Sequence, residues 1–386
     1  MQRNCNEYPA MKIAIFETEH FEGAFPVIKL FDMPGNKITI ITSGETYNRF
    51  ADLFLTDTNR YGWTILSAAG KFRFFYSLYK NLKRQKPDLL YINTISNNHI
   101  LYAFVLYLLS LKRVVLTVHD INCLFESRFS WHFRQAIIHW GKKWLVRRIH
   151  EFNVVSDTMI PYLQEKAKGK PTHVVPGAVF EHKQSPRFVK DILQLVVPGS
   201  LDKRRRDYEQ VFALAAIADK EKLPLRIILL GGYHDEYGET VLLRASKFES
   251  ASCEISAYNT GIVGQAEFDQ QMDASHFVFI PSVIDTKICG DIPEVYGITK
   301  SSGNMFDVIK HAKPFIVPAG LTISPQLQTS CFKYDGASDL VIFLKNIIAG
   351  TEEYNKWQEE ALHNSQNYTV EKIRSKNISL FHEKNS

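Results

Sequence analysis

Short apolar runs alternate with longer helix-like segments along this sequence, and the alternation occurs twice. Strands that alternate with helices predict βαβ units and parallel sheets, because a parallel connection needs a long crossover. The first series has predicted strands at 11–16, 37–42, 89–93, 114–118, 151–155 and 173–175, and helices at 72–86 and 100–111. The second has strands at 193–197, 225–230, 277–280 and 315–317, and helices at 208–218, 241–248 and 268–272. The sequence therefore predicts two open α/β domains.

The length agrees with this division, because 386 residues exceed the usual size of a single hydrophobic core. A polar segment at 181–187, which contains Pro186, is the predicted linker. The tail at 354–381 has amphipathic helical spacing. We expect a first domain at 11–186, a second at 187–365, and a C-terminal helix at 366–386 that packs back on the first domain.

Composition indicates a globular protein of a reducing compartment. The hydrophobic fraction is 45% and the charged fraction 23%. The 5 cysteines are scattered without paired spacing, which argues against a disulfide framework or a zinc site. Residues 1–10 lack the apolar core of a signal peptide, and the longest apolar stretch, 100–111, is about half of the ~20 residues that a spanning helix needs. We expect a cytoplasmic protein.

The segment 294–318 predicts an anion-binding loop. Its polar, Gly-containing part leads into an apolar-periodic helix that ends at Lys313-Pro314, and a buried strand follows. The start of a helix presents free N–H groups and the positive end of the dipole, which together hold an anion. Asp307 lies one turn into this helix, where its carboxylate can accept hydrogen bonds from two sugar hydroxyls.

This segment resembles the donor-nucleotide signature of retaining glycosyltransferases with the GT-B fold, especially family 4. That family has a Glu, a second Glu after seven intervening residues, and a helix that ends in Gly-Lys-Pro. Aligning Lys313-Pro314 on the Lys-Pro places Asp307 on the second Glu, which binds the ribose. Thr299 falls on the first Glu, which faces the donor sugar, so the carboxylate is absent there; Glu294 can replace it only if the loop is remodelled. The resemblance implies two Rossmann-like domains that face each other across a cleft.

The resemblance also implies the rest of the donor site. The turn after residues 193–197 carries Gly199 and a run of cations, in which Arg205 takes the position of a family Lys and Ser200 replaces a family Arg. Guanidinium groups there suit a diphosphate, although such a run is also typical of a solvated basic loop. The loop at 258–264 resembles the main chain that holds the nucleobase, or is an ordinary Gly turn. The predicted donor-binding residues are Gly23, Gly199, Arg205, Arg206, Ile262, Val263, Thr299, Lys300, Ser302, Gly303 and Asp307.

His119 ends a predicted strand of the first half, in a Val-His-Asp segment similar to one whose His approaches the donor sugar in the family. A hydrogen-bonded structural His is the alternative. We expect His119, Asp120 and Asn93 on the acceptor side, and His119, Arg205 and Glu294 as the catalytic set. No protein base is required in the favoured mechanism of the family, because the leaving diphosphate can take the proton of the acceptor.

Two segments of the first half carry cations but no acidic residue. They are 71–86 and 128–150, and both are rich in aromatic residues. Basic residues interleaved with aromatics suit the surface of an anionic membrane. A solvated helix face and a nucleic-acid site are the alternatives; a net charge of +5 is modest for a nucleic-acid binder. We favour peripheral association with the inner face of the cell membrane and expect no nucleic acid.

The sequence thus predicts a glycosyltransferase that moves a sugar from a nucleotide-sugar to a saccharide or lipid-linked acceptor, in surface polysaccharide or glycolipid synthesis. We expect a metal-independent enzyme, because no Asp-x-Asp motif lies in a suitable loop, and no cofactor besides the nucleotide-sugar substrate. One alternative is a GT-B subunit that binds a sugar or partner without catalysis. The other is a sugar-nucleotide epimerase that uses Glu17, Glu294 and His119. The donor sugar, base, acceptor and linkage stay open.

Overall fold

The computed structural model describes residues 9–54, 58–67, 70–127, 131–181, 192–233, 235–250, 252–288 and 290–382. The chain forms two compact units. The first contains residues up to Ala178, the short segment Thr299–Ser301 and the residues from Val370 onward; the second contains Val179–Ile298 and Ser302–Thr369. The second unit begins before the predicted boundary because the Phe180 N–H donates to the Tyr368 carbonyl at 3.0 Å. Beyond Glu181, the predicted linker lies outside the described residues.

The first unit contains a seven-stranded parallel sheet in the order β3-β2-β1-β4-β5-β6-β7. The strand β1 pairs with β2 on one side and with β4 on the other, so the winding direction reverses at β1. In open α/β sheets, ligands bind outside the carboxyl ends of the strands at this reversal. The predicted alternation is confirmed, and β3 was missed. The strands are β1 (Lys12–Phe16), β2 (Lys37–Ser43), β3 (Gly62–Leu66), β4 (Leu89–Ile92), β5 (Val114–Thr117), β6 (Glu151–Val154) and β7 (Thr172–Val174).

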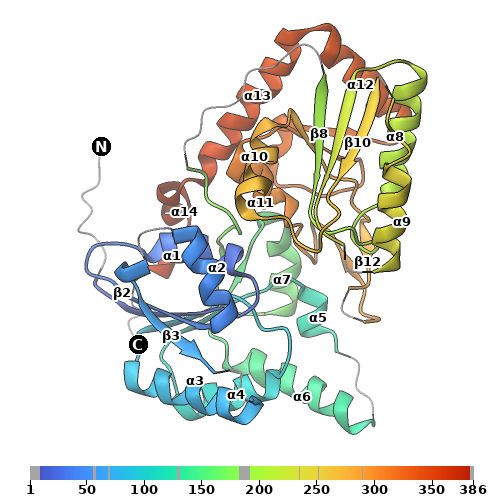
Figure 1. Cartoon of the computed structure of the whole chain (residues 1–386). Coiled ribbons are helices and arrows are strands. Elements are labelled where there is room, and N and C mark those ends of the chain that lie inside the picture. The colour runs from blue at the N-terminus through green and yellow to red at the C-terminus, as the bar shows by residue number, and fades with distance from the viewer. Residues whose placement is uncertain are drawn as a thin grey trace. The chain divides into compact units, whose positions relative to one another are not determined.

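Helices cover both faces of this sheet. Figure 1 shows α3, α4 and α6 along one face and α1 and α2 along the other. Apolar residues at helical spacing point inward; on α3, for example, Phe75, Leu78 and Leu82 are buried. The helices are α1 (Phe21–Phe31), α2 (Gly44–Phe54), α3 (Lys71–Gln85), α4 (His99–Leu109), α5 (Ile121–Phe125), α6 (Phe133–Arg148), α7 (Ile160–Lys166) and α14 (Val370–Lys376).

The C-terminal segment packs on the first unit, as the expected fold class requires. Arg374 of α14 donates to the carbonyls of Leu30 and Lys29, both at 2.8 Å, and the Phe381 ring lies 5.4 Å from that of Phe31. The single helix predicted for 354–381 was wrong. An extended Thr369 divides the tail, so that α13 belongs to the second unit and α14 to the first.

A buried ion pair fixes the end of the chain. Arg113 donates to Glu151 at 2.7 and 2.9 Å and to the carbonyl of Leu380 at 3.0 Å, and His173 lies 2.7 Å from the same carboxylate. Burial alone would raise the pKa of Glu151, but the bonds from His173 and Arg113 hold it below the ordinary value. The C-terminal backbone is therefore attached through a charged side chain that is only 5% exposed.

The second unit has a six-stranded parallel sheet in the order β10-β9-β8-β11-β14-β15. Its winding direction reverses at β8, between β9 and β11. The strands β10 and β15 were not predicted. The strands are β8 (Leu193–Pro198), β9 (Leu225–Leu230), β10 (Cys253–Ala257), β11 (Phe277–Phe279), β14 (Phe315–Pro318) and β15 (Cys331–Tyr334), and a separate antiparallel pair is formed by β12 (Asp285–Thr286) and β13 (Glu294–Val295).

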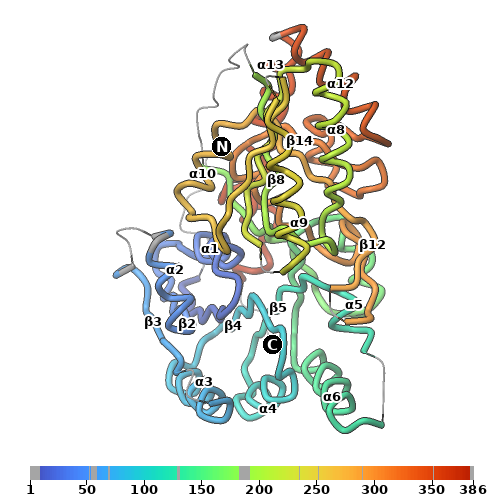
Figure 2. The backbone as a smooth tube through the Cα atoms, turned by 45° about the vertical axis from the view of Figure 1, so that its right-hand side comes forward, coloured from blue at the N-terminus to red at the C-terminus, as the bar shows by residue number. Residues whose placement is uncertain are grey.

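Helices also cover both faces of the second sheet. Figure 2 shows α8 and α12 on one side and α10 on the other. The core is aromatic: the Phe277 ring lies 5.5 Å from Phe343 and 5.7 Å from Tyr354. The helix predicted at 241–248 begins earlier, because Asp235 accepts the Gly238 N–H at 3.0 Å and so caps its start. The helices are α8 (Tyr208–Lys220), α9 (Glu236–Ala245), α10 (Gln265–Ala274), α11 (Asn304–His311), α12 (Ala337–Ala349) and α13 (Thr351–Ser365).

None of the described helices combines the length and apolar character that crossing a lipid bilayer requires.

The Arg113→Leu substitution should strongly destabilise the first unit. It leaves the Glu151 carboxylate buried beside fewer donors, and breaking a buried ion pair in this way costs about 3–5 kcal/mol. Thermal unfolding followed by circular dichroism measures the effect. Arg226→Leu is the matched control, because its pair with Glu254 is about 40% exposed on both sides and contributes at most ~1 kcal/mol. Equal melting temperatures for the two variants would contradict this assignment.

Candidate functional site

Glycines at the carboxyl edge of the second sheet allow three loops to pack backbone against backbone. A Cβ atom on Gly231 would overlap the carbonyl of Gly199, and one on Gly232 would overlap the carbonyl of Gly261. The Leu201 N–H also donates to the Gly232 carbonyl at 2.9 Å. The loops after β8, β9 and β10 therefore form one compact edge whose main-chain groups lie close together.

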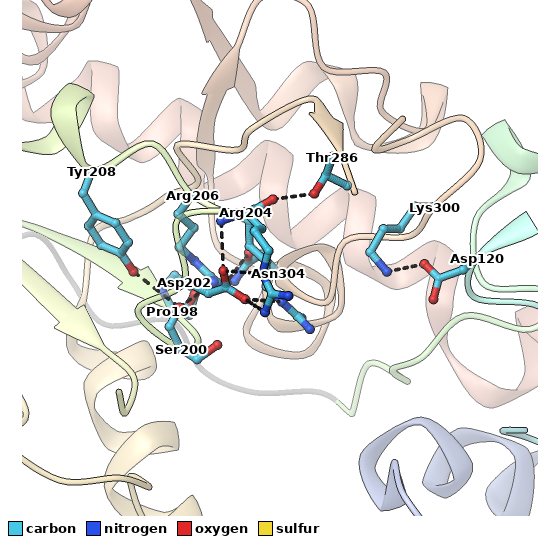
Figure 3. A network of polar contacts seen from close by, with 11 residues as sticks. Asp120, Pro198, Ser200, Asp202, Arg204, Arg206, Tyr208, Thr286, Lys300 and Asn304 are labelled. Atoms are coloured by element: carbon cyan, nitrogen blue, oxygen red, sulfur yellow. Dashed lines mark hydrogen bonds and ion pairs between the residues drawn. The ribbon is translucent and has the colours of Figure 1, made fainter. Parts of the chain in front are cut away.

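Arg206 braces this edge from inside. Its buried guanidinium donates to the carbonyls of Ser200, at 2.9 Å, and Pro198, and to Asn304 Oδ1 at 3.1 Å (Figure 3). Asn304, the first residue of α11, also donates to the Pro198 carbonyl at 2.8 Å. Gly199 has φ +93°, and a Cβ atom there would overlap the guanidinium. Arg206, predicted to bind the donor, thus joins the loop after β8 to the start of α11 and acts as a positioning residue.

Arg205 differs from its neighbour because it is exposed. Its Nε lies 3.5 Å from Asp202 Oδ2, whereas Arg204 contacts both oxygens of that carboxylate, at 3.1 and 2.9 Å. Asp202 therefore engages Arg204 the more closely, and the Arg205 guanidinium keeps donors for an anion. Lys203 beside it is exposed as well.

The start of α11 is open. Gly303 stands at the cap position with φ −58°, is exposed, and has free space where a Cβ atom would lie. Ser302 before it is buried. The Met305 N–H donates to the Ser302 carbonyl at 3.1 Å and the Phe306 N–H to the Gly303 carbonyl at 2.9 Å, so the positive end of this eight-residue helix borders open space at Gly303.

Asp307 is the most unusual charged group of this edge. Its side chain is half-buried and has no hydrogen-bond or ion-pair partner among the described residues. Burial raises the pKa of this carboxyl to about 7, against the opposing effects of His311, Lys310 and Arg206. A carboxyl held in this state without a partner lowers stability and is typical of a ligand-binding group.

The helix that carries Asp307 is held by α10. Lys310 contacts Asp269 at 2.7 and 2.9 Å, and His311 Nδ1 contacts Asp273 at 2.5 Å. Lys313, of the predicted Lys-Pro stop, is buried and donates to the carbonyls at the end of α10 at 2.7 Å. The Lys-Pro pair therefore has a structural role here, because the lysine ties the end of α11 to α10.

The loop after β10 exposes its backbone around two glycines, Gly261 and Gly264, together with the Ile262 side chain. Ile262 is exposed, Val263 is half-buried, and the Gly261 carbonyl lies against Gly232. Such a loop can recognise a planar base through main-chain N–H and C=O groups.

In the first unit, Glu17 organises the corresponding edge. Its buried carboxylate accepts hydrogen bonds from Asn93 at 2.7 Å, from Thr94 at 2.8 Å, and from the backbone N–H groups of His20, at 2.8 Å, and Glu19. It therefore joins the loops after β1 and β4, the strands between which the winding reverses. Sequence reasoning offered Glu17 only as an epimerase residue, since nothing in the sequence shows which backbone donors surround a carboxylate.

Asn93 holds His119 in place. The His119 Nε2–H donates to the Asn93 carbonyl at 3.1 Å, while the Asn93 amide donates to Glu17. Burial, together with the nearby His20, lowers the pKa of His119, so the ring is neutral near pH 7 and presents Nδ1 as an acceptor. Asn93 is buried and supports His119 without presenting its own side chain. Gly23 lies beside it: a Cβ atom there would come within 3.3 Å of the Asn93 amide nitrogen.

The segment Thr299–Ser301 completes the first unit beside His119. The Thr299 carbonyl accepts the Ile121 N–H at 2.8 Å, and the Ser301 N–H donates to the His119 carbonyl at 3.2 Å. Lys300 forms an ion pair with Asp120 (Figure 3). Lys300 was predicted to bind the donor and Asp120 the acceptor, and in the structure their charges balance each other. Thr299, predicted to bind the donor, is buried.

Glu294, predicted as catalytic, lies in the second unit and is 1% exposed, in β13 opposite Thr286. The predicted residues therefore form two groups, each described within its own unit. Gly199, Arg205, Arg206, Ile262, Val263, Ser302, Gly303 and Asp307 belong to the second unit, and Gly23, Asn93, His119, Asp120, Thr299 and Lys300 to the first. Sequence reasoning missed Asn304, whose only signal is its place at the start of the predicted helix.

Comparison with known proteins agrees with this architecture. Residues 29–181 match the family model described as Glycosyltransferase Family 4. A crystal structure of a glycosyltransferase from Rickettsia africae superposes with a TM-score of 0.65 at 13% identity, over 98% of this chain and 100% of that chain. The fold is GT-B, and residues 29–181 are similar to glycosyltransferase family 4.

Two further similar structures were solved with bound ligands. HepE of Anabaena in complex with UDP gives a TM-score of 0.64 at 12% identity, over 96% of this chain and 99% of that one. A UDP-GlcNAc 2-epimerase from Neisseria meningitidis bound to UDP-GlcNAc gives a TM-score of 0.54 at 11% identity, over 95% of this chain and 100% of that one. No curated protein sequence matches this chain. At these identities the likeness to solved structures shows the fold.

Two alanine substitutions at glycines of this GT-B protein should have opposite outcomes. Gly199→Ala places a Cβ atom against Arg206 at positive φ, which costs at least roughly 1–2 kcal/mol, and should lower the melting temperature of the second unit. Gly303→Ala adds a methyl group in open space at helical φ and should leave stability unchanged or slightly raised. Differential scanning calorimetry measures both melting temperatures. An unchanged melting temperature in Gly199→Ala would contradict the close packing of Gly199 against the Arg206 guanidinium.

Proposed function

We propose that this GT-B protein is a glycosyltransferase that moves a sugar from a nucleotide-sugar to a saccharide or lipid-linked acceptor. The observation that carries the proposal is Asp307, a carboxyl without a partner in the first turn of a helix whose start is open. The Gly-lined edge and the exposed Arg205 beside the brace complete the features of a nucleotide site. The likeness to HepE, whose structure was solved with UDP, supports a nucleoside diphosphate as the group to be bound.

In this proposal each group of the second unit has one task. Asp307 accepts hydrogen bonds from two ribose hydroxyls, and the backbone at Ile262 and Val263 recognises the base. The diphosphate lies against Arg205 and the N–H groups at Gly303. Ser302 and Arg206 hold these groups in place from the interior.

The chemistry then rests on charge stabilisation. The bond from the anomeric carbon to the diphosphate oxygen breaks, and negative charge develops on the diphosphate. Arg205 and the α11 dipole stabilise that charge without rearrangement. The acceptor oxygen bonds to the anomeric carbon and its proton goes to the departing phosphate oxygen, so no protein base is consumed. We propose retention of configuration and no requirement for a metal or a further cofactor.

We assign the acceptor to the first unit. The neutral His119 ring offers Nδ1 to a sugar hydroxyl, and the Asp120–Lys300 pair lies beside it in sequence and structure. An acceptor of this kind fits assembly of a surface polysaccharide or glycolipid in the cytoplasm.

Two alternatives have separate support. The likeness to the Neisseria epimerase favours a sugar-nucleotide epimerase, but the Glu17 carboxylate already accepts from Asn93, Thr94 and the backbone, so it is not available as an acid or base. The Thr299 side chain in place of a carboxylate favours a subunit that binds a sugar or partner without catalysis.

The Asp307→Asn substitution should weaken nucleotide binding and stabilise the fold. Loss of a charge-assisted hydrogen bond predicts a UDP dissociation constant at least tenfold higher. Burial raises the pKa of Asp307, so its ionisation above pH 7 destabilises the folded state. The variant should therefore have a higher melting temperature than the unsubstituted protein at pH 8. Below pH 4, where the carboxyl is protonated in both the folded and the unfolded state, this difference should disappear. Affinity of the unsubstituted protein should fall as the pH drops from 8 to 6.

Isothermal titration calorimetry with UDP measures these affinities, and Asp285→Asn, an exposed residue of the same unit, is the control. Unchanged UDP affinity in Asp307→Asn, or a pH profile identical in both proteins, would remove Asp307 from the site.

A panel of nucleotide-sugars with and without saccharide acceptors tests the activity. We expect nucleoside diphosphate to be released only when the acceptor is present. Arg205→Ala should lower turnover at least tenfold, whereas the control Arg226→Ala should keep the turnover of the unsubstituted protein. Conversion of the donor without an acceptor would establish the epimerase, and binding without turnover the non-catalytic subunit. An active Arg205→Ala variant would refute its role at the diphosphate.

A further inference from the structure

Three neighbouring helices of the first unit expose aromatic side chains to solvent. On α3, Phe72 is 83% and Tyr76 is 67% exposed, and on α6, Phe133 is 81% exposed and Trp140 is 55% exposed. Helix α4 adds Phe104, Tyr107 and Leu108, each about half exposed. Single exposed apolar residues are ordinary on a protein surface, whereas several on one layer mark an interaction site.

The exposed residues follow the helical period, so they share faces. Phe72, Tyr76 and Lys80 are spaced four apart on α3, opposite the buried Phe75 and Leu78. On α4 the exposed Phe104, Tyr107 and Leu108 also lie three and four apart. Each helix thus packs one side on the sheet and turns an aromatic side outward.

The three helices lie side by side in both views (Figures 1 and 2). Trp144 of α6 is 6.3 Å from Phe104 and 6.1 Å from Tyr107 of α4, measured between ring centroids. The Arg148 guanidinium lies 4.7 Å above the Tyr107 ring. The outward sides of α3, α4 and α6 therefore form one surface, here called the cationic–aromatic face.

The charge of this face has a single sign. The segments 70–86, 99–114 and 131–150 contain no Asp or Glu. Lys142 does not contribute, because it is buried and donates to the Cys123 carbonyl, and Arg128 lies outside the described residues. The exposed cations on the outward sides of α3 and α6 are Arg73, Lys80, Lys83, Arg84, Lys143 and Arg147.

We propose that the cationic–aromatic face docks on the anionic surface of a lipid bilayer. Lysine and arginine attract anionic headgroups, and tryptophan, tyrosine and phenylalanine side chains enter the headgroup region. The exposed aliphatic residue Leu108 decides against nucleic acid, since it matches the acyl boundary and offers nothing to phosphates or bases. The binding needs no sugar transfer, so it stands independently of the proposed activity.

Co-sedimentation with vesicles tests the proposal. The full chain should bind vesicles of phosphatidylcholine with 30% phosphatidylglycerol at least tenfold better than pure phosphatidylcholine vesicles, and less well in 0.5 M salt. Emission of Trp140 and Trp131, both exposed, should shift to the blue when vesicles are added.

The test variant combines Lys80→Gln, Lys83→Gln and Lys143→Gln on the face. The control removes equal charge from exposed sites of the second unit with Lys220→Gln, Lys247→Gln and Lys287→Gln. Vesicle binding should fall at least tenfold in the first and less than twofold in the second, with the UDP affinity of the unsubstituted protein kept in both. A separate Phe72→Ala, Trp140→Ala variant should also bind vesicles less well at unchanged charge.

Several results would overturn the proposal. They are equal binding to neutral and anionic vesicles, equal losses in the two lysine variants, or full binding after removal of Phe72 and Trp140. A single-stranded oligonucleotide that binds as tightly as the vesicles and competes with them would identify nucleic acid as the partner instead.

Discussion

Backbone-to-backbone packing at the carboxyl edge of the second sheet is the constraint on which the candidate site depends. Gly199, Gly231 and Gly232 let three loops meet where any Cβ atom would overlap a carbonyl or a guanidinium. Arg206 fills the space beside Gly199 and ties that loop to α11 through Asn304. Because α11 is fixed in this way, Asp307, Gly303 and the exposed Arg205 have defined positions at one edge. Without the glycines, the remaining polar residues would have no common frame.

The two sheets show how a doubly wound fold creates such edges. In each, the winding reverses next to the first strand of the unit, β1 or β8, and the loops after the strands at the reversal carry the polar groups. In the first unit, the loops at the corresponding edge are joined without adjacent glycines. There the buried Glu17 carboxylate joins the loops after β1 and β4, and the Asn93 carbonyl orients His119.

The alternation of apolar runs and helices was enough to predict two parallel sheets, because burial on both faces makes each strand a continuous apolar run. It missed the edge strands β3, β10 and β15, and in β3 and β10 polar residues such as Thr64 and Glu254 alternate with apolar ones. Asp307 and Arg205 were predicted as site residues from the resemblance. The brace by Arg206 and the ion pair of Lys300 with Asp120 could not be predicted, since they join residues far apart in sequence. Within the basic segment 128–150, Lys142 turns inward and donates to the Cys123 carbonyl, which helical spacing alone does not show.

The central claim is that a nucleoside diphosphate binds at the Gly-lined edge and the start of α11. Hydrogen–deuterium exchange of the full chain with and without saturating UDP tests it directly. We expect protection of the backbone at 199–206, 261–264 and 302–307, which are the loops that this edge brings together. UDP binding that leaves these segments unprotected, or protects only segments elsewhere in the chain, would contradict the account.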